Sequence, residues 1–411
     1  MLAVIEVYLL TIRDVAQSGS VHAWGAWGRK FKSCHPDFLN PKNMKKIILL
    51  LLVINFSCAQ EDSTINEPEN KIYELELIHP TKNIPWSIEF IDEKTIIYTE
   101  KRGNIFIVSD DNIVEVKGIP SIYERGQGGL MDIELHPDFK ENNLIFLSYA
   151  SGDRESGGNT AIASANLIDG KLINLKVLYK GEENTTRGQH FGSRIQLDND
   201  GFLYFTIGDR GNRDVNPQDL KKDGGKVYRI NIDGSIPEDN PFFNEIDTKK
   251  AIYSYGHRNP QGIFLHPETG KIWTNEHGPR GGDEINIIYA GKNYGWPRIT
   301  YGINYVGTTI TKNKSLPGLE QPLYYWVPSI APSSFEFVWS ENYENWKGSL
   351  LAGSLKYMYL ERLELTDGKV SYREKIAKNV GRVRDVKLSP KGLIYIAVEN
   401  KGIFRLNPIT E

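Results

Sequence analysis

The residue types best suited to acid–base chemistry stand in the segment RGQHFGSRIQLDNDGFLYFTIGDRG. His190 precedes one predicted strand and Asp209 ends the next, and in a β-sheet blade these two ends meet. A carboxylate beside an imidazole fixes its tautomer and stabilises the cation that forms when the ring accepts a proton. The pair predicts a general base. A solvated loop histidine beside an aspartate turn is the alternative from these residues alone.

Two further motifs offer polar groups to a ligand. GHRNPQG places the guanidinium of Arg258 and the amide of Asn259 at the start of a strand, where a turn cap is the simpler interpretation. EHGPRGGDEINII holds Gly278 and Pro279, whose carbonyls suit a hard cation, and Glu284, whose carboxylate suits calcium. An acidic turn without a metal fits this second motif equally well.

Basic residues recur in two late motifs, GSLKY and GRVRDV. Lys356 lies in the first, and Arg382 and Arg384 lie in the second. Their alternate spacing puts the two arginines on one face of a strand. Two like charges on one face indicate an anion, most simply a multiply carboxylated or phosphorylated ligand, although solvated surface arginines are the alternative.

These motifs are embedded in a repeat that runs from about residue 75 to the C-terminus. Six units show period-2 alternation of aromatic and β-branched residues, with Gly, Asp, Asn or Pro at the turns. Each unit spans roughly 56 residues, close to the length of a propeller blade. We therefore predict an all-β fold, a six-bladed β-propeller, because a pair of β-sandwiches does not explain six similar units. Longer loops are expected at 115–129, 151–190, 210–225, 235–250, 278–284 and 300–330.

Composition excludes several classes of protein. The chain has 411 residues, 25% of them charged, and a formal net charge of −3. It lacks the basic excess and the aromatic-plus-basic strings of nucleic-acid-binding proteins, so we expect no nucleic-acid partner. Its two cysteines, Cys34 and Cys58, cannot build a disulfide scaffold or an iron–sulfur site.

The N-terminal part predicts export. MKKIILLLLVINFSCAQEDST begins at Met44 with two lysines and an apolar run too short for a membrane span, which is typical of a signal peptide over 44–58. Cys58 then fits either a lipoprotein site or ordinary cleavage. We interpret 1–43 as an upstream extension, 59–72 as a polar tether and 73–411 as the propeller. The expected location is the periplasm, or the outer membrane or cell surface with membrane contact only through a lipid on Cys58.

Taken together, the motifs resemble those of the soluble quinoprotein aldose dehydrogenases of the glucose/sorbosone type. The matching segments, in order over about 75–408, are GQGGLMDIELHPDF, QHFGSRI, TIGD, GHRNPQG, EHGPRGGDEIN, KNYGWP, GSLKY and GRVRDV. The resemblance implies a six-bladed propeller that binds pyrroloquinoline quinone (PQQ) with Ca2+. It also implies oxidation of aldose sugars at C1 to lactones, with electrons passed to an external acceptor.

The resemblance further implies roles for individual residues. His190 matches the base that takes the proton of the anomeric hydroxyl while hydride passes to the quinone, and Asp209 matches the carboxylate that orients it. Arg258 matches a residue that stabilises charge on the reduced quinone oxygen. The residues that match cofactor contacts are Gln127, Arg258, Asn259, Tyr305, Ser354, Leu355, Lys356, Arg382, Val383 and Arg384.

The calcium ligands implied by the resemblance are mainly carbonyls. Those of Gly278 and Pro279 would hold calcium at the cofactor, where it acts as a Lewis acid, and Glu284 with the carbonyl of Tyr294 matches a further calcium site. Gln189 stands where glucose-oxidising members carry an acid, which places the chain nearer the broad-specificity aldose branch. Residues 324–326 are candidates for stacking on a sugar. A lactonase-type calcium hydrolase and a non-catalytic ligand-binding propeller are the alternative functions.

Overall fold

The computed structural model describes residues 65–66, 72–110 and 112–409. By its internal contacts the chain divides into two units, 1–61 and 62–411. The predicted extension over 1–43 and the predicted signal peptide over 44–58 lie outside the described residues. Within the segment predicted as a tether, strand β1 (Ile65–Asn66) pairs in parallel with β22 (Lys369–Ile376). No helix among the described residues is long and apolar enough to cross a membrane.

The second unit consists of six sheets, which confirms the predicted all-β, six-bladed propeller. The first three sheets along the chain are β3 (Pro85–Phe90), β4 (Thr95–Glu100), β5 (Asn104–Ser109) and β6 (Asn112–Glu115); β7 (Leu130–Leu135), β8 (Leu144–Asp153), β9 (Gly157–Ile168) and β10 (Lys171–Lys180); and β11 (Ile195–Leu197), β12 (Phe202–Ile207), β13 (Lys226–Asn231) and β14 (Ile252–Tyr255).

The other three sheets complete the ring. They are β15 (Pro260–Leu265), β16 (Ile272–Glu276), β17 (Asp283–Ile287) and β18 (Tyr324–Trp326); β19 (Pro332–Phe337), β20 (Leu350–Ser354), β21 (Tyr359–Thr366) and β22, with β1 at the edge; and β23 (Val383–Leu388), β24 (Ile394–Val398) and β25 (Gly402–Pro408), with β2 (Tyr73–Pro80) outermost. One turn of helix, α3 (Phe139–Asn142), joins β7 to β8.

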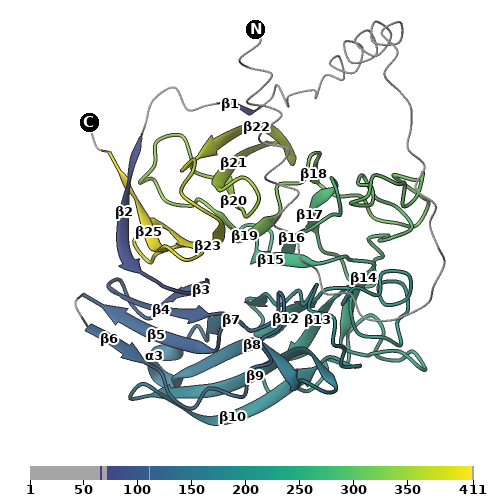
Figure 1. Cartoon of the computed structure of the whole chain (residues 1–411), viewed down its shortest axis with the longest axis horizontal. Helices are drawn as coiled ribbons and strands as arrows, with labels where there is room; N and C mark the ends of the chain where they lie inside the picture. Colours follow the sequence, from purple (N-terminus) through teal and green to yellow (C-terminus); the bar gives the residue numbers. More distant parts are fainter. Residues whose placement is uncertain (1–64, 67–71, 111, 410–411) are drawn as a thin grey trace, which may run out of the picture. The chain divides into compact units, whose positions relative to one another are not determined.

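The first strands of the blades lie at the centre of the ring, as Figure 1 shows for β3, β7, β15, β19 and β23. These inner strands β3, β7, β11, β15, β19 and β23 each contact the next one, and β23 contacts β3 in turn. The last blade takes its outer strand from the beginning of the unit, because β2 pairs antiparallel with β25 from Tyr73↔Pro408 to Pro80↔Gly402. The two ends of the unit therefore close the ring.

The blades hold together through apolar faces that no single sheet can cover by itself. Leu351 and Leu360 of the fifth blade pack in one buried cluster with Val386 and Ile396 of the sixth. The alternation that identified the strands in the sequence thus puts their apolar side chains between neighbouring blades.

One expectation about loops was wrong. Residues 151–180 lie mainly in the long strands β8, β9 and β10 rather than in a loop. This stretch contains many Gly, Ser, Asn and Thr residues, but Asn159 and Thr160 are buried and bonded, with Thr160 Oγ1 donating to the Phe191 carbonyl at 2.6 Å. Contacts with the following blade therefore outweighed the low strand preference of the Gly and Asn residues.

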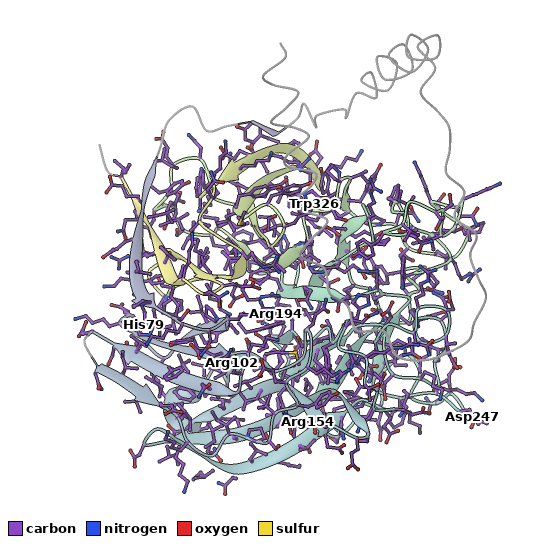
Figure 2. All side chains as sticks on the ribbon, viewed as in Figure 1. His79, Arg102, Arg154, Arg194, Asp247 and Trp326 are labelled. Atoms are coloured by element: carbon purple, nitrogen blue, oxygen red, sulfur yellow. The ribbon has the colours of Figure 1, made fainter. Side chains whose placement is uncertain are left out.

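The side chain of Arg194 links the inner strands at the centre of the ring, and Figure 2 labels this residue. Its guanidinium bonds Asp132 Oδ1 at 2.8 Å and Asp385 Oδ1 at 3.2 Å, and donates to the carbonyls of Gln261 and Arg384 at 2.9 Å each. Asp132, Asp385 and Arg194 are all buried. A single side chain thus links inner strands of four blades.

Candidate active site

His190 and Asp209 meet as the sequence predicted. His190 lies in the connection from β10 to β11, and its Nδ1 is 2.6 Å from Asp209 Oδ1 at the end of β12. The backbone amide of His190 donates to Gln127 Oε1 at 2.7 Å, which joins a third predicted residue to the pair. His190 has a φ of +55°, a left-handed conformation that non-glycine residues rarely adopt and that often marks a functional site.

The surroundings of this pair favour a neutral imidazole. Burial, and next the positive charge of Arg258, lower the pKa of His190 below its ordinary value, while Asp209 opposes them. Burial by itself would raise the pKa of Asp209, but its bond to His190 and the nearby Arg258 hold that pKa below its usual range. The carboxylate is therefore charged and the imidazole neutral near pH 7, as a general base requires.

Asp209 is fixed at both carboxylate oxygens. Oδ1 also accepts from the Gly211 amide at 2.7 Å, and Oδ2 accepts from the Trp296 indole Nε1 at 2.9 Å. Trp296 belongs to the motif KNYGWP, which was noted in the sequence without a role for the tryptophan. The hydrogen bond from its indole nitrogen fixes the orientation of the carboxylate toward His190.

Arg258 and Asn259 are held by a residue that the sequence reasoning missed. Glu276, at the end of β16, accepts from the backbone amides of both at 2.5 and 3.3 Å. Arg258 Nη1 donates to the His277 carbonyl at 2.8 Å. Asn259 Oδ1 accepts from the Gly192 amide at 3.1 Å, but its Nδ2 is buried without a hydrogen-bond partner. A buried donor without a partner is costly and fits a site that a ligand completes.

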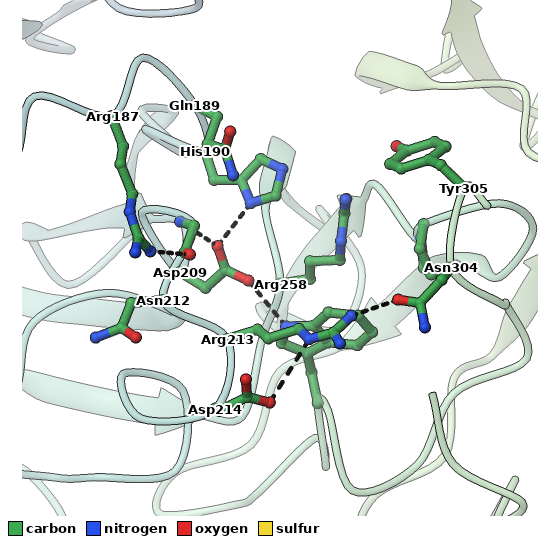
Figure 3. Close-up of a pocket in the computed structure, with 13 residues that line it drawn as sticks. Arg187, Gln189, His190, Asp209, Asn212, Arg213, Asp214, Arg258, Asn304 and Tyr305 are labelled. Atoms are coloured by element: carbon green, nitrogen blue, oxygen red, sulfur yellow. Dashed lines mark hydrogen bonds and ion pairs between the residues drawn. The ribbon is translucent and has the colours of Figure 1, made fainter. Parts of the chain in front are cut away.

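A cavity of about 310 Å³ brings His190, Asp209, Arg258 and Trp296 together, and Figure 3 shows its walls. Arg258 lies between His190 and Tyr305 in this view, and Tyr305 is 71% exposed. The lining residues are Arg187, Gln189, His190, Asp209, Gly211, Asn212, Arg213, Asp214, Arg258, Pro279, Trp296, Asn304 and Tyr305. The cavity is large enough for part of a drug-sized ligand and is lined mainly by polar groups.

The two arginines predicted to bind an anion come together, but they already have an acidic partner. Arg382 Nε and Arg384 Nε lie 2.6 and 3.1 Å from the carboxylate oxygens of Glu399. Arg382 Nη1 also donates to the Leu355 carbonyl at 2.9 Å, which joins GRVRDV to GSLKY. Lys356 is exposed, with its Nζ 4.6 Å from the Tyr357 ring centroid. Glu399, next to β24, gave no signal in the sequence.

The two other residues predicted on these segments are buried. Ser354 Oγ donates to the Ile330 carbonyl at 2.9 Å and accepts from the Tyr357 amide at 3.1 Å. Val383 is fully buried, and its carbonyl accepts from Ser333 Oγ at 2.8 Å. Both therefore shape the backbone beneath the basic residues.

The residues predicted to hold calcium lie close to each other. Pro279 lines the large cavity, and its carbonyl accepts from Ser329 Oγ at 3.1 Å. Gly278, Glu284 and Tyr294 line a neighbouring space of about 10 Å³, close to the room of one water-sized occupant. Among the described residues, no group of three or more His, Cys, Asp or Glu side chains is arranged to hold a metal.

Glu284 has an unusual environment for a carboxylate. Burial and the neighbouring Glu276 raise its pKa well above the ordinary value. Asn286 Nδ2 donates to both carboxylates, at 3.1 Å to Glu276 and 3.3 Å to Glu284, while the buried Asn286 Oδ1 has no partner. A bound cation would relieve the repulsion between the two carboxylates.

The suggested aromatic stack on a sugar is wrong for Trp326. Trp326 is buried, and its indole Nε1 donates to Glu361 at 3.2 Å. Tyr325 is stacked on Tyr301 with ring centroids 3.6 Å apart. The cavity wall instead contains Arg187, Arg213 and Asn304, which the sequence reasoning did not name.

Comparisons with known proteins found similar sequences and structures. Residues 82–405 match the family model described as Glucose / Sorbosone dehydrogenase. The aldose sugar dehydrogenase YliI of Escherichia coli is 36% identical over 336 residues, 80% of this chain and 90% of that protein. Quinoprotein glucose dehydrogenase B of Acinetobacter calcoaceticus is 28% identical over 83% of this chain and 88% of its own length.

A solved structure extends the likeness to three dimensions. The crystal structure of the soluble aldose sugar dehydrogenase from Escherichia coli in the apo-form superimposes with a TM-score of 0.79 at 34% identity. The superposition covers 82% of this chain and 100% of that one.

Proposed function

Because the chain belongs to the glucose/sorbosone dehydrogenase family and is therefore an oxidoreductase, we propose that it oxidises aldose sugars at C1 to lactones. PQQ is the proposed oxidant, since the related quinoprotein glucose dehydrogenase B is named for such a cofactor. An external acceptor then receives the electrons. The observation that carries the proposal is the neutral, half-buried His190, which Asp209 holds in the same cavity as Arg258.

The proposed site fits PQQ in two respects. The buried Asn259 Nδ2 has no protein partner, and the basic residues Lys356, Arg382 and Arg384 suit the cofactor's carboxylates. Glu399 keeps the two arginines oriented while the cofactor is absent. When bound, PQQ supplies the oxidant that accepts the two electrons and the hydrogen of the C1–H bond.

Calcium is proposed as a second cofactor. The carbonyls of Gly278 and Pro279 would hold it beside PQQ, where a hard cation draws charge from a carbonyl oxygen. Glu284 and the Tyr294 carbonyl would hold a further ion. The Asn286 Oδ1 without a partner and the raised pKa of Glu284 support that site, since a cation would give the amide oxygen a partner and stabilise the charged form of the carboxylate.

The chain's own residues then perform the proton chemistry. His190 Nδ1 is occupied by Asp209, so Nε2 is the nitrogen that removes the proton of the anomeric hydroxyl. As C1–O becomes a carbonyl, the imidazolium that forms is stabilised by the Asp209 carboxylate. Arg258, whose guanidinium is 5.5 Å from the Trp296 ring centroid, offers positive charge to the developing negative charge of the reduced cofactor.

The test is a titration of the purified chain with PQQ, with and without Ca2+, followed by dye reduction with a panel of aldoses. We expect saturable PQQ binding and sugar-dependent dye reduction. His190→Ala should keep PQQ binding and lose about 10² to 10⁴-fold in kcat, the usual contribution of a positioned base. Unchanged turnover in this variant, or no PQQ binding by the parent chain, would contradict the proposal.

We also propose that the protein is exported. The lysines and apolar run after Met44 support a signal peptide over 44–58, and the polar segment over 59–72 supports a tether behind a lipid on Cys58. Mass spectrometry of the mature N-terminus distinguishes acylation at Cys58 from ordinary cleavage.

A further inference from the structure

The cavity has a second set of basic side chains that the proposed chemistry does not use. Arg187, in the connection from β10 to β11, and Arg213, in the connection from β12 to β13, lie on the walls of the His190 cavity (Figure 3). Neither belongs to the motifs proposed to hold the cofactor. Both are on the loops that carry the general base and its carboxylate, which is where a sugar oxidised at C1 must lie.

Arg187 has donors to spare and no acidic partner. Its Nη1 donates to the Gly211 carbonyl, and no carboxylate of a described residue lies within ion-pair distance of it. Glu182 and Glu183, the acids closest to it in sequence, lie 2.8 Å from Lys249 and Lys222, respectively. The guanidinium therefore presents an uncompensated positive charge at the cavity.

Arg213 is held in place by a neutral group. Its Nη1 donates to Asn304 Oδ1 at 2.7 Å, and Asn304 Nδ2 in turn donates to Thr308 Oγ1 at 2.9 Å. Its acidic neighbour Asp214 is 3.5 Å away and its side chain is 81% exposed, so the ion pair between them is weak. The orientation of the guanidinium is fixed while most of its charge stays available.

The remaining groups in the cavity do not cancel these charges. Besides Asp214, the cavity lining contains the carboxylate of Asp209. Its Oδ1 is bound to His190 and the Gly211 amide, and its Oδ2 is bound to Trp296. Gln189, next to the base, is uncharged. The sugar side of the cavity is thus positive, and a planar guanidinium pairs in a two-pronged way with carboxylate or phosphate.

We infer that the preferred substrate is an anionic aldose, a sugar that carries a carboxylate or phosphate remote from C1 and that pairs with Arg187 and Arg213. This inference rests on the proposed function. The reaction is otherwise unchanged: C1 loses its hydrogen with two electrons to the cofactor, and the anomeric hydroxyl loses its proton to His190. The charged group keeps all of its atoms.

The experiment compares three pyranoses that differ at C6, namely glucose, glucuronate and glucose 6-phosphate. The chain is saturated with PQQ and Ca2+, and kcat/KM is measured at about 0.01 M and at about 0.2 M salt, between which the Debye length falls from about 30 Å to below about 8 Å. We expect kcat/KM for at least one anionic sugar to exceed that for glucose about tenfold, and salt to reduce this preference. A preference for glucuronate identifies a carboxylate, and one for glucose 6-phosphate identifies a phosphate.

Variants separate the two arginines from general charge effects. Arg213→Gln and Arg187→Gln should each lower the ratio of kcat/KM between anionic and neutral sugar severalfold. Arg154→Gln, at an exposed arginine outside the cavity lining, should leave that ratio unchanged. The dissociation constant of PQQ, measured in each variant, shows whether the arginines act on the cofactor instead; a loss of PQQ affinity with an unchanged sugar ratio would overturn the inference.

Failure of the inference is distinguishable from failure of the proposed function. If glucose is oxidised and neither anionic sugar exceeds it, the inference is wrong and the dehydrogenase stands. If no aldose reduces the dye, calorimetric titration with glucuronate and glucose 6-phosphate decides between the two. Binding that Arg213→Gln weakens then supports the anion site, and absence of binding overturns it.

Discussion

The role of Asp209 can be tested with a substitution that preserves its shape. In Asp209→Asn, one carboxylate oxygen is replaced by an NH₂ group, which is a hydrogen-bond donor. The native carboxylate accepts hydrogen bonds from the Gly211 amide and the Trp296 indole and contacts Nδ1 of His190. If the amide nitrogen faces Trp296, two N–H groups oppose each other. If it faces His190, it also opposes the Gly211 amide and donates to Nδ1, which leaves the proton on Nε2. The imidazole then cannot accept the proton of the anomeric hydroxyl.

The expected loss follows from this geometry. Removing the base function costs about 10² to 10⁴-fold, or roughly 3 to 5 kcal/mol of transition-state stabilisation at 1.36 kcal/mol per tenfold change. Trp296→Phe is the matched control, because it removes one hydrogen bond to a charged acceptor and keeps the carboxylate. This substitution should reduce transition-state stabilisation by about 1.5 to 3 kcal/mol, which lowers kcat roughly 10 to 150-fold.

The assay is steady-state dye reduction with saturating PQQ and Ca2+, together with the PQQ dissociation constant of each variant. We expect kcat to fall in the order parent, Trp296→Phe, Asp209→Asn, with PQQ affinity nearly constant. If Asp209→Asn retains more than about a third of the parent kcat, or if Trp296→Phe is the more damaging change, the orientation argument is refuted.

Three further predictions concern charge. Arg258→Gln removes one cause of the lowered pKa of His190, so that pKa should rise and the acidic limb of the kcat/KM–pH profile should move to higher pH; a limb that stays in place contradicts the assigned electrostatics. Replacing Arg382 and Arg384 together by Gln should weaken PQQ binding at least tenfold, whereas Arg405→Gln on the outer side of the same blade should not, as measured by equilibrium titration. Arg194→Leu leaves two buried aspartates unpaired and should lower the free energy of unfolding in urea by about 3 to 5 kcal/mol, and a loss below 1 kcal/mol would show that the central network carries little stability.

The local signals of the sequence were sufficient for the blades and for the reacting pair. Alternation and turn residues identified all six sheets, because each strand has one face against a neighbouring blade. His190 and Asp209 were paired correctly because they flank a single hairpin. Partners from distant segments were not predictable in the same way: Trp296 lies 87 positions from Asp209, and a tryptophan in KNYGWP does not indicate where its indole nitrogen points.

The anion-binding interpretation of Arg382 and Arg384 illustrates a second limit. Their spacing indicated one face of a strand, and the structure places them together. The spacing did not reveal Glu399, which binds both arginines, because that pairing depends on the hairpin register between β23 and β24. The same limit applies to Asn159 and Thr160, whose polar character suggested a loop although the neighbouring blade buries them.

The pairing of β2 with β25 has a consequence for the order in which the molecule can form. Synthesis produces β2 before the strands of the first five blades and β25 after them, so the sixth blade cannot be completed before those five blades have been synthesised. Until then β25 is missing and β24 has an unpaired edge, the kind of edge that invites association between chains. Such contacts between distant positions also slow folding. The two ends of the unit therefore belong to the same blade. Removing either β2 or β25 should open the ring of blades rather than merely shorten the chain.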